Sequence, residues 1–239
     1  MTREYFGRDL EAMSFAGRYH RWVFELMQPW LGKRIVEVGA GQGSFAEILL
    51  GAAPEALALI EPSQMYERLV ANKNLRRFDG QIELLNQTFP SVASELKRDF
   101  RPDSIVYVNV LEHIEDDLTE LKCVADTLPD SGRIFLFVPA IPLLYSRFDR
   151  RLGHYRRYTR SELLGKMQLA GFEVEEIRWF DSVGILPWLI NYRLLGLEKM
   201  NATAVAAYDR LLVPALKRIE DAIRAPIGKN LFAVGIRRT

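Results

Sequence analysis

Short runs of β-branched and aliphatic residues alternate with segments of helical periodicity along most of the chain. This alternation is typical of a mostly parallel sheet whose strands are joined by crossover helices. Seven runs are expected to form strands: Arg34–Val38, Ala56–Ile60, Ile82–Leu85, Ser104–Val110, Arg133–Val138, Glu173–Trp179 and Leu231–Ile236. Four helices are expected between them: Ser44–Leu50, Gln64–Asn72, Asp116–Thr127 and Ser161–Ala170, the last capped by Thr159 or Ser161. The pattern predicts a doubly wound, Rossmann-like α/β fold.

Two stretches fall outside this alternation. Residues 1–31 are expected to supply leading helices, because apolar and aromatic residues recur at helical spacing from Leu10 to Leu31. Residues 181–230 form a helix-rich insertion before the last strand, and it suits a lid, a homodimer surface or a membrane-facing element. A length of 239 residues fits one domain, so we expect residues 1–239 to fold together.

Composition narrows the functional classes. Lysine and arginine total 32 against 31 acidic residues, so the net charge is +1 and no nucleic-acid partner is expected. Cys123 is the one cysteine, which excludes an internal disulfide and suits a reducing, cytoplasmic compartment. Charged residues near the N-terminus argue against a signal peptide. The apolar stretch Val183–Ile190 is far shorter than the ~20 residues of a spanning helix, so contact with a membrane surface is the open possibility.

A glycine-rich turn follows the first predicted strand and precedes a predicted helix. Its residues Gly39, Ala40, Gly41 and Gly43 allow backbone to approach a ligand, and the helix start offers unpaired N–H groups, so we expect a nucleotide-like ligand. A dinucleotide fingerprint would need Gly or Ala at the position of Ser44. A nicotinamide-dependent oxidoreductase is therefore the less favoured alternative, and a purely structural turn is another.

The G-x-G-x-G spacing, with Glu37 on the strand before it, resembles the class I S-adenosylmethionine-dependent methyltransferases. The resemblance runs from about Tyr5 to Arg237 and implies S-adenosylmethionine as methyl donor, S-adenosylhomocysteine as product and an antiparallel seventh strand. It also implies that Glu37 holds the turn and contacts the methionine ammonium. Glu61 ends the second strand, where a carboxylate can accept hydrogen bonds from both ribose hydroxyls.

The same resemblance assigns further cofactor contacts. The segment after the third predicted strand would hold the adenine, the Leu-Glu-His segment after the fourth would lie beneath the methyl donor, and an aromatic residue of the leading helix could touch the cofactor. These residues are Tyr19, Pro62, Ser63, Gln87, Thr88, Asn109, Val110 and Leu111.

Two histidines follow strands at the edge where open α/β sheets bind ligands. His113 comes after the fourth strand and His154 after the fifth, so either could remove a proton from a hydroxyl acceptor. An orienting role for His113 and a solvated loop for His154 are the alternatives. His154 is slightly favoured as base or acceptor contact, because aromatic residues and arginines surround it in sequence.

A metal centre is a further hypothesis. Ubiquinone-pathway and small-RNA methyltransferases are similar here, with a Glu-x-x-Glu-His cluster and a later histidine that bind a divalent metal. The matching residues are Glu112, His113 and His154, and they could hold a catalytic metal with an open position. Asn109 replaces the first carboxylate, which makes the implied ligand set incomplete.

Six arginines lie between Arg147 and Arg160, and guanidinium groups bind carboxylate or phosphate in a bidentate manner. Tyr155, Arg156 and Arg157 are therefore candidate contacts to an anionic acceptor, with a salt-bridged face as the alternative. The sequence as a whole predicts a methyltransferase acting on an oxygen of a small-molecule or glycan acceptor. N-methylation of an amine and a non-catalytic cofactor-binding scaffold are the remaining alternatives.

Overall fold

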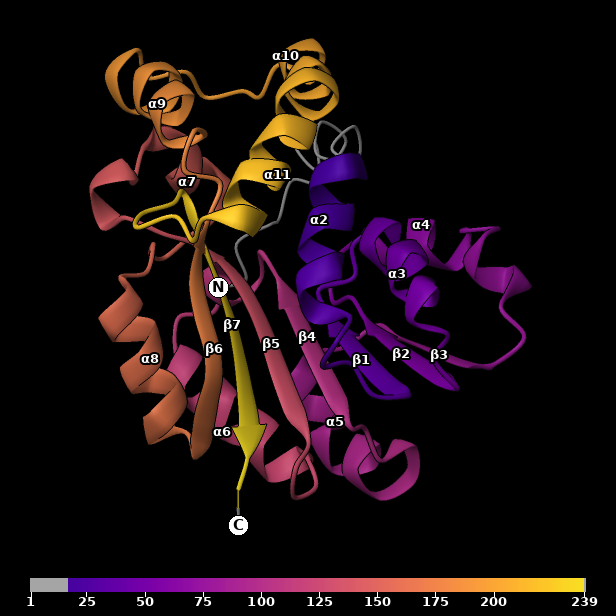
Figure 1. Cartoon of the computed structure of the whole chain (residues 1–239). Helices are drawn as coiled ribbons and strands as arrows, with labels where there is room; N and C mark the ends of the chain where they lie inside the picture. Colours follow the sequence, from indigo (N-terminus) through magenta and orange to yellow (C-terminus); the bar gives the residue numbers. More distant parts are fainter. Residues whose placement is uncertain (1–16, 239) are drawn as a thin grey trace.

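The computed structural model describes residues 17–238, which form a seven-stranded sheet with helices on both faces (Figure 1). The strand order is β3-β2-β1-β4-β5-β7-β6, and β7 alone runs antiparallel to its neighbours. The strands are β1 (Arg34–Val38), β2 (Ala56–Ile60), β3 (Gln81–Leu85), β4 (Ser104–Val108), β5 (Arg133–Pro139), β6 (Phe172–Phe180) and β7 (Asn230–Arg237). The predicted doubly wound fold and its antiparallel last strand are confirmed.

The central strands are buried on both faces, as their near-continuous apolar sequences require. Successive residues of β1 show this, because Ile35 packs into one hydrophobic cluster and Val36 into the other. The predicted strand Ser104–Val110 is too long at its end. It stops at Val108 because Asn109 has a φ of 54°, which extended backbone does not adopt.

Ten helices of the described chain cover the two faces and the carboxyl edge of the sheet. On one face α5, α6 and α8 pack against the sheet, and on the other α2, α3, α4 and α11 do so. Their bounds are α2 (Gly17–Met27), α3 (Ser44–Leu49), α4 (Tyr66–Val70), α5 (Phe89–Glu95), α6 (Asp117–Thr127), α7 (Arg147–Leu152), α8 (Arg160–Leu169), α9 (Ile185–Trp188), α10 (Ala202–Ala207) and α11 (Val213–Ala222).

The predicted helices all exist, although two real ones were not predicted. The helix expected at Gln64–Asn72 is shorter, and Thr159 rather than Ser161 caps α8 by accepting a hydrogen bond from the Glu162 amide. The missed helices are α5 and α7. Residues 1–16 of the predicted leading segment lie outside the described residues.

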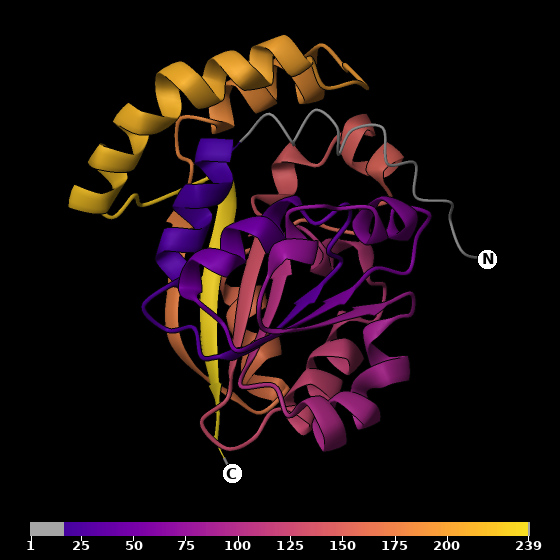
Figure 2. The same cartoon turned by 90° about the vertical axis from the view of Figure 1, so that its right-hand side faces the viewer.

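The insertion between β6 and β7 is helical, as predicted, and lies over the carboxyl edge of the sheet (Figure 2). A π-helical turn η6 (Leu189–Leu194) extends α9, and another, η7 (Tyr208–Leu212), joins α10 to α11. Two buried carboxylates of the insertion accept hydrogen bonds from α2 and from the residues directly after β6. Asp209 accepts from the Tyr19 amide at 2.8 Å, and Glu220 accepts from the amides of Asp181 and Ser182 at 3.0 and 2.8 Å.

Candidate functional site

The glycine turn lies where the strand order reverses, between β1 and β4, which is the usual ligand site of an open α/β sheet. Gly39 has a φ of 73°, and a Cβ there would lie 2.4 Å from Val110 Cγ2. Gly43 starts α3 with a φ of 89°, and a Cβ there would lie 2.7 Å from Leu75 Cδ1. Both positions therefore favour glycine. The short distance from Gly39 to Val110 also shows that the fold brings the predicted turn next to this predicted cofactor residue.

Glu61 connects the end of β2 to the glycine turn. Its buried carboxylate accepts hydrogen bonds from the Gly41 amide at 2.7 Å and from the Ser63 amide at 2.9 Å. Each carboxylate oxygen can accept more than one hydrogen bond, so both remain able to accept from a ribose hydroxyl. The structure thus brings together three residues that the sequence assigned to the cofactor.

Glu37 on β1 is a buried carboxylate with an oxygen that can still accept a hydrogen bond. It is 3% exposed, and its Oε2 has no hydrogen-bond partner among the described residues. Burial raises the pKa of Glu37 to about 8, and the negative charge of Glu61 adds to this. An acceptor of this kind fits a cationic group, such as the methionine ammonium of S-adenosylmethionine.

We expect S-adenosylhomocysteine binding to release a proton from Glu37. A nearby ammonium favours the ionised carboxylate, so the pKa falls below about 8 in the complex and affinity rises as the pH rises toward that value. Calorimetry in buffers of different ionisation enthalpy measures the proton. Glu37→Gln should bind at least about tenfold more weakly and release none, whereas equal release from this variant would point to another group.

The turn after β4 places its residues at the carboxyl edge of the sheet. Leu111–His113 form a 3₁₀ turn, η4, and the preceding Asn109 donates its amide to the Phe137 carbonyl at 2.8 Å. Leu111 and Glu112 are fully buried, whereas His113 is partly exposed. The left-handed backbone at Asn109 turns the chain from the strand into this arrangement.

Three predicted residues meet at this edge. The rings of His113 and His154 are 4.6 Å apart between centroids, and His154 Nε2 lies 3.9 Å from Glu112 Oε1. Burial raises the pKa of Glu112 to about 7, against the opposing charge of His154. Burial, with a smaller contribution from His154, lowers the pKa of His113 to about 3. His113 is therefore neutral at physiological pH, whereas Glu112 changes its charge near neutral pH, and a nearby cation would favour its ionised form.

Asp149 holds His154, a role that the sequence analysis missed. Its Oδ1 lies 3.1 Å from His154 Nδ1, and its Oδ2 accepts from the Ser146 amide at 2.9 Å. Burial raises the pKa of Asp149, but hydrogen bonds from His154 and Arg157 outweigh burial and hold the pKa below its ordinary value. An ionised Asp149 keeps the proton on Nδ1 and leaves Nε2 to face Glu112 and His113. The Ser146–Asp149 capping box at the start of α7 was the available signal.

The two arginines assigned to an anionic acceptor are bound within the protein. Arg157 is 3% exposed, pairs with Asp149 at 2.7 Å and lies over the Trp188 ring at 4.5 Å. Arg156 pairs with Asp117 at 2.7 Å. The contact of Arg156 favours the alternative of a salt-bridged face, and the contacts of Arg157 give it a buried structural role beneath His154.

The remaining residues that the sequence assigned to the cofactor or the acceptor do not form one cluster. Tyr155 is 42% exposed, and its amide donates to the Glu112 carbonyl, which joins the two histidine loops. Gln87 and Thr88 are exposed after β3. Tyr19 packs against aromatic residues of β5 and β6, and its hydroxyl donates to Asn230 at 3.2 Å, so its described contacts do not include the glycine turn. Pro62 is exposed beside Glu61.

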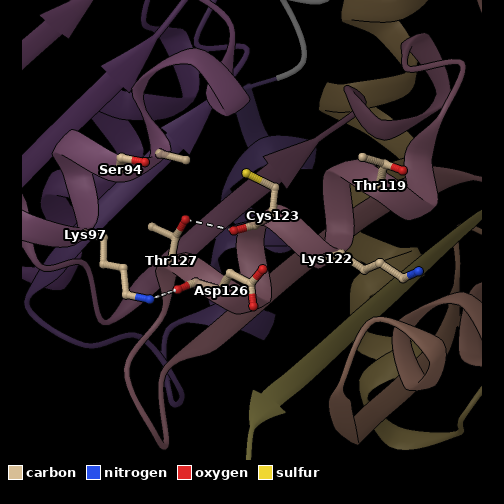
Figure 3. A pocket seen from close by; sticks show the side chains of 8 residues that line it. Ser94, Lys97, Thr119, Lys122, Cys123, Asp126 and Thr127 are labelled. Carbon is tan, nitrogen blue, oxygen red and sulfur yellow. Dashed lines mark hydrogen bonds between the residues drawn. The ribbon is translucent and has the colours of Figure 1, made fainter.

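A surface groove of about 390 Å³ lies elsewhere, between α5 and α6 (Figure 3). Its wall includes Cys123, whose carbonyl accepts from the Thr127 hydroxyl, and Lys97, which donates to the Asp126 carbonyl. None of the residues assigned to the cofactor or to acceptor chemistry lines it. We assign it no part in the reaction.

Comparisons with known proteins identify the family of the chain. The family model described as a methyltransferase domain matches residues 15–177. The ubiquinone biosynthesis O-methyltransferase of Xanthomonas euvesicatoria pv. vesicatoria (strain 85-10) is 25% identical over 192 residues, which cover 73% of this chain and 76% of that protein.

Solved structures share the fold. A methyltransferase in complex with the Haloferax volcanii Trm112 methyltransferase activator has a TM-score of 0.63 at 13% identity, covering 98% of this chain and 95% of that one. A SAM-dependent methyltransferase from Archaeoglobus fulgidus has a TM-score of 0.57 at 16% identity, covering 92% and 94%. The family match favours methyl transfer over the nicotinamide-dependent alternative. The chain belongs to the class I S-adenosylmethionine-dependent methyltransferases.

Proposed function

We propose that this enzyme methylates a hydroxyl group of a small-molecule or glycan acceptor. The observation that carries the proposal is the Asp149–His154 pair, which presents an imidazole Nε2 beside Glu112 at the edge of the sheet that holds the glycine turn. A hydroxyl must lose its proton to become a good nucleophile, and a histidine oriented by a carboxylate is a suitable general base. The named activity of the 25%-identical relatives supports the same chemistry.

The proposed reaction is an in-line displacement at the methyl carbon. The acceptor oxygen forms a bond to that carbon while the carbon–sulfur bond breaks, and the hydroxyl proton passes to His154 Nε2. The bonding electron pair stays on sulfur, so neutral S-adenosylhomocysteine leaves. His113 is the weaker candidate base, because its pKa of about 3 lies far from neutral pH.

The cluster also fits a divalent metal, which is the second candidate means of activating the hydroxyl. Donor atoms of Glu112, His113 and His154 all lie within 4.8 Å of one another. Both Glu112 oxygens are buried without a hydrogen-bond partner among the described residues, and Asp149 orients His154 as carboxylates commonly orient metal-binding histidines. A metal held by these three residues would lower the pKa of an acceptor hydroxyl.

A panel of acceptors tests the proposal. Phenols, catechols and sugars are incubated with S-adenosylmethionine carrying a deuterated methyl group, each beside the matching amine, and products are identified by mass spectrometry. We expect the label on oxygen. Transfer to amines alone would refute the proposed hydroxyl chemistry, and full turnover after treatment with EDTA would exclude the metal.

A further inference from the structure

The helical insertion carries a row of apolar side chains that face solvent. Leu186, Ile190 and Leu194 follow one another at spacings of four residues along α9 and η6, and Leu197 lies three residues beyond the end of η6. Leu143, which follows β5, accepts a hydrogen bond at its carbonyl from the Arg193 side chain. Their exposed fractions range from 41% for Ile190 to 74% for Leu143. We refer to these five residues as the apolar ridge.

The apolar ridge is not the packing face of its helix. Trp188 and Tyr192, by contrast, pack against α7. Their ring centroids lie 5.6 and 4.6 Å from that of the buried Phe148 on α7. The helix is therefore held to the body of the protein by its aromatic residues, and α9 and η6 contain no buried residue of their own. An exposed row of large aliphatic side chains on a docked helix indicates an interaction surface.

Basic side chains border the apolar ridge. Arg147, Arg150 and Arg151 on α7 line a surface groove of about 350 Å³ together with Glu198, and the Arg151 guanidinium donates to the Glu198 carbonyl. Arg193 lies within η6 itself and is exposed. Within residues 17–238, these four arginines form no ion pair with a carboxylate. Their charge is thus available to an external anion.

We propose that the apolar ridge and these four arginines bind the surface of an anionic lipid bilayer. Large aliphatic side chains bordered by arginine match the boundary between acyl chains and negatively charged headgroups. Among the described residues, no helix is both long enough and apolar enough to cross a bilayer. In the proposed arrangement the ridge lies in the boundary region and the arginines lie at the headgroups.

Vesicle flotation tests this proposal with the full-length protein. We expect binding to vesicles of phosphatidylcholine mixed equally with phosphatidylglycerol, weaker binding to phosphatidylcholine alone, and loss of the difference at high salt. The double variant Leu186→Asp/Leu194→Asp should lose at least about tenfold in binding to the mixed vesicles, because two charges replace apolar side chains that the bilayer would bury. Arg147→Gln/Arg150→Gln should show a smaller preference for the mixed vesicles than the wild type does, and an unchanged preference would contradict the role of these arginines.

Leu169→Asp is the matched control, because Leu169 is 71% exposed but lies at the end of α8, away from the insertion. It should bind vesicles as the wild type does, and all variants should keep the wild-type affinity for S-adenosylhomocysteine, which shows that they fold. Absence of wild-type binding, or an equal loss in Leu169→Asp, would overturn the proposal. So would a dimer that Leu186→Asp/Leu194→Asp converts to a monomer in the absence of vesicle binding.

Discussion

Replacing His154 by alanine should lower kcat by about 10²–10⁴-fold, the usual contribution of a positioned general base. The substitution removes Nε2 but leaves the glycine turn and Glu61 intact, so the dissociation constant for S-adenosylhomocysteine should stay within about twofold of the wild type. Steady-state kinetics with a hydroxyl acceptor and calorimetry with S-adenosylhomocysteine measure the two effects separately.

Asp149→Asn refines this test. Asparagine keeps the size of the side chain but no longer fixes the proton on Nδ1, so kcat should fall and the pH dependence of kcat should change. The contact with Arg157 weakens at the same time, and the melting temperature shows whether the fold is retained. A His154→Ala variant with nearly wild-type kcat would refute the role of this histidine.

Replacing Glu61 by alanine should raise the dissociation constant for S-adenosylhomocysteine at least about 100-fold. The variant would lose two hydrogen bonds that the ribose hydroxyls donate to a charged carboxylate, each contributing about 1.5–3 kcal/mol. It also leaves the amides of Gly41 and Ser63 without their acceptor, so the turn loses its connection to β2. Isothermal calorimetry measures the change.

Glu55→Ala is the control for this substitution. Glu55 is exposed directly before β2, at the end of the strand opposite to Glu61, and its described hydrogen bonds are made by its backbone. We expect wild-type affinity from it. Equal weakening in both variants would mean that general loss of stability, rather than loss of the ribose contact, explains the effect.

The sheet and the cofactor side of the site could be predicted because local sequence determines them. Buried strands such as β2 are continuous apolar runs, and Gly39 and Gly43 adopt positive φ values that favour glycine in the tight turn. Likewise, Glu61 directly follows β2, so its place at the edge of the sheet follows from the strand alone.

Features that depend on distant contacts could not be predicted in the same way. Arg157 looked like a surface residue in an arginine-rich loop, yet Asp149 and Trp188 bury it. The missed helix α5 is short and has a proline in its first turn, and its burial against α6 rather than its periodicity stabilises it. The end of β4 was misplaced because apolar residues continue past Asn109, while the backbone turns there.

A crystal structure of the complex with S-adenosylhomocysteine tests the central claim most directly. The account predicts the amino-acid end of the ligand on the turn from Gly39 to Gly43, the ribose hydroxyls on Glu61, and the sulfur open toward His113 and His154. A ligand bound elsewhere, or a sulfur atom that faces away from both histidines, would contradict it.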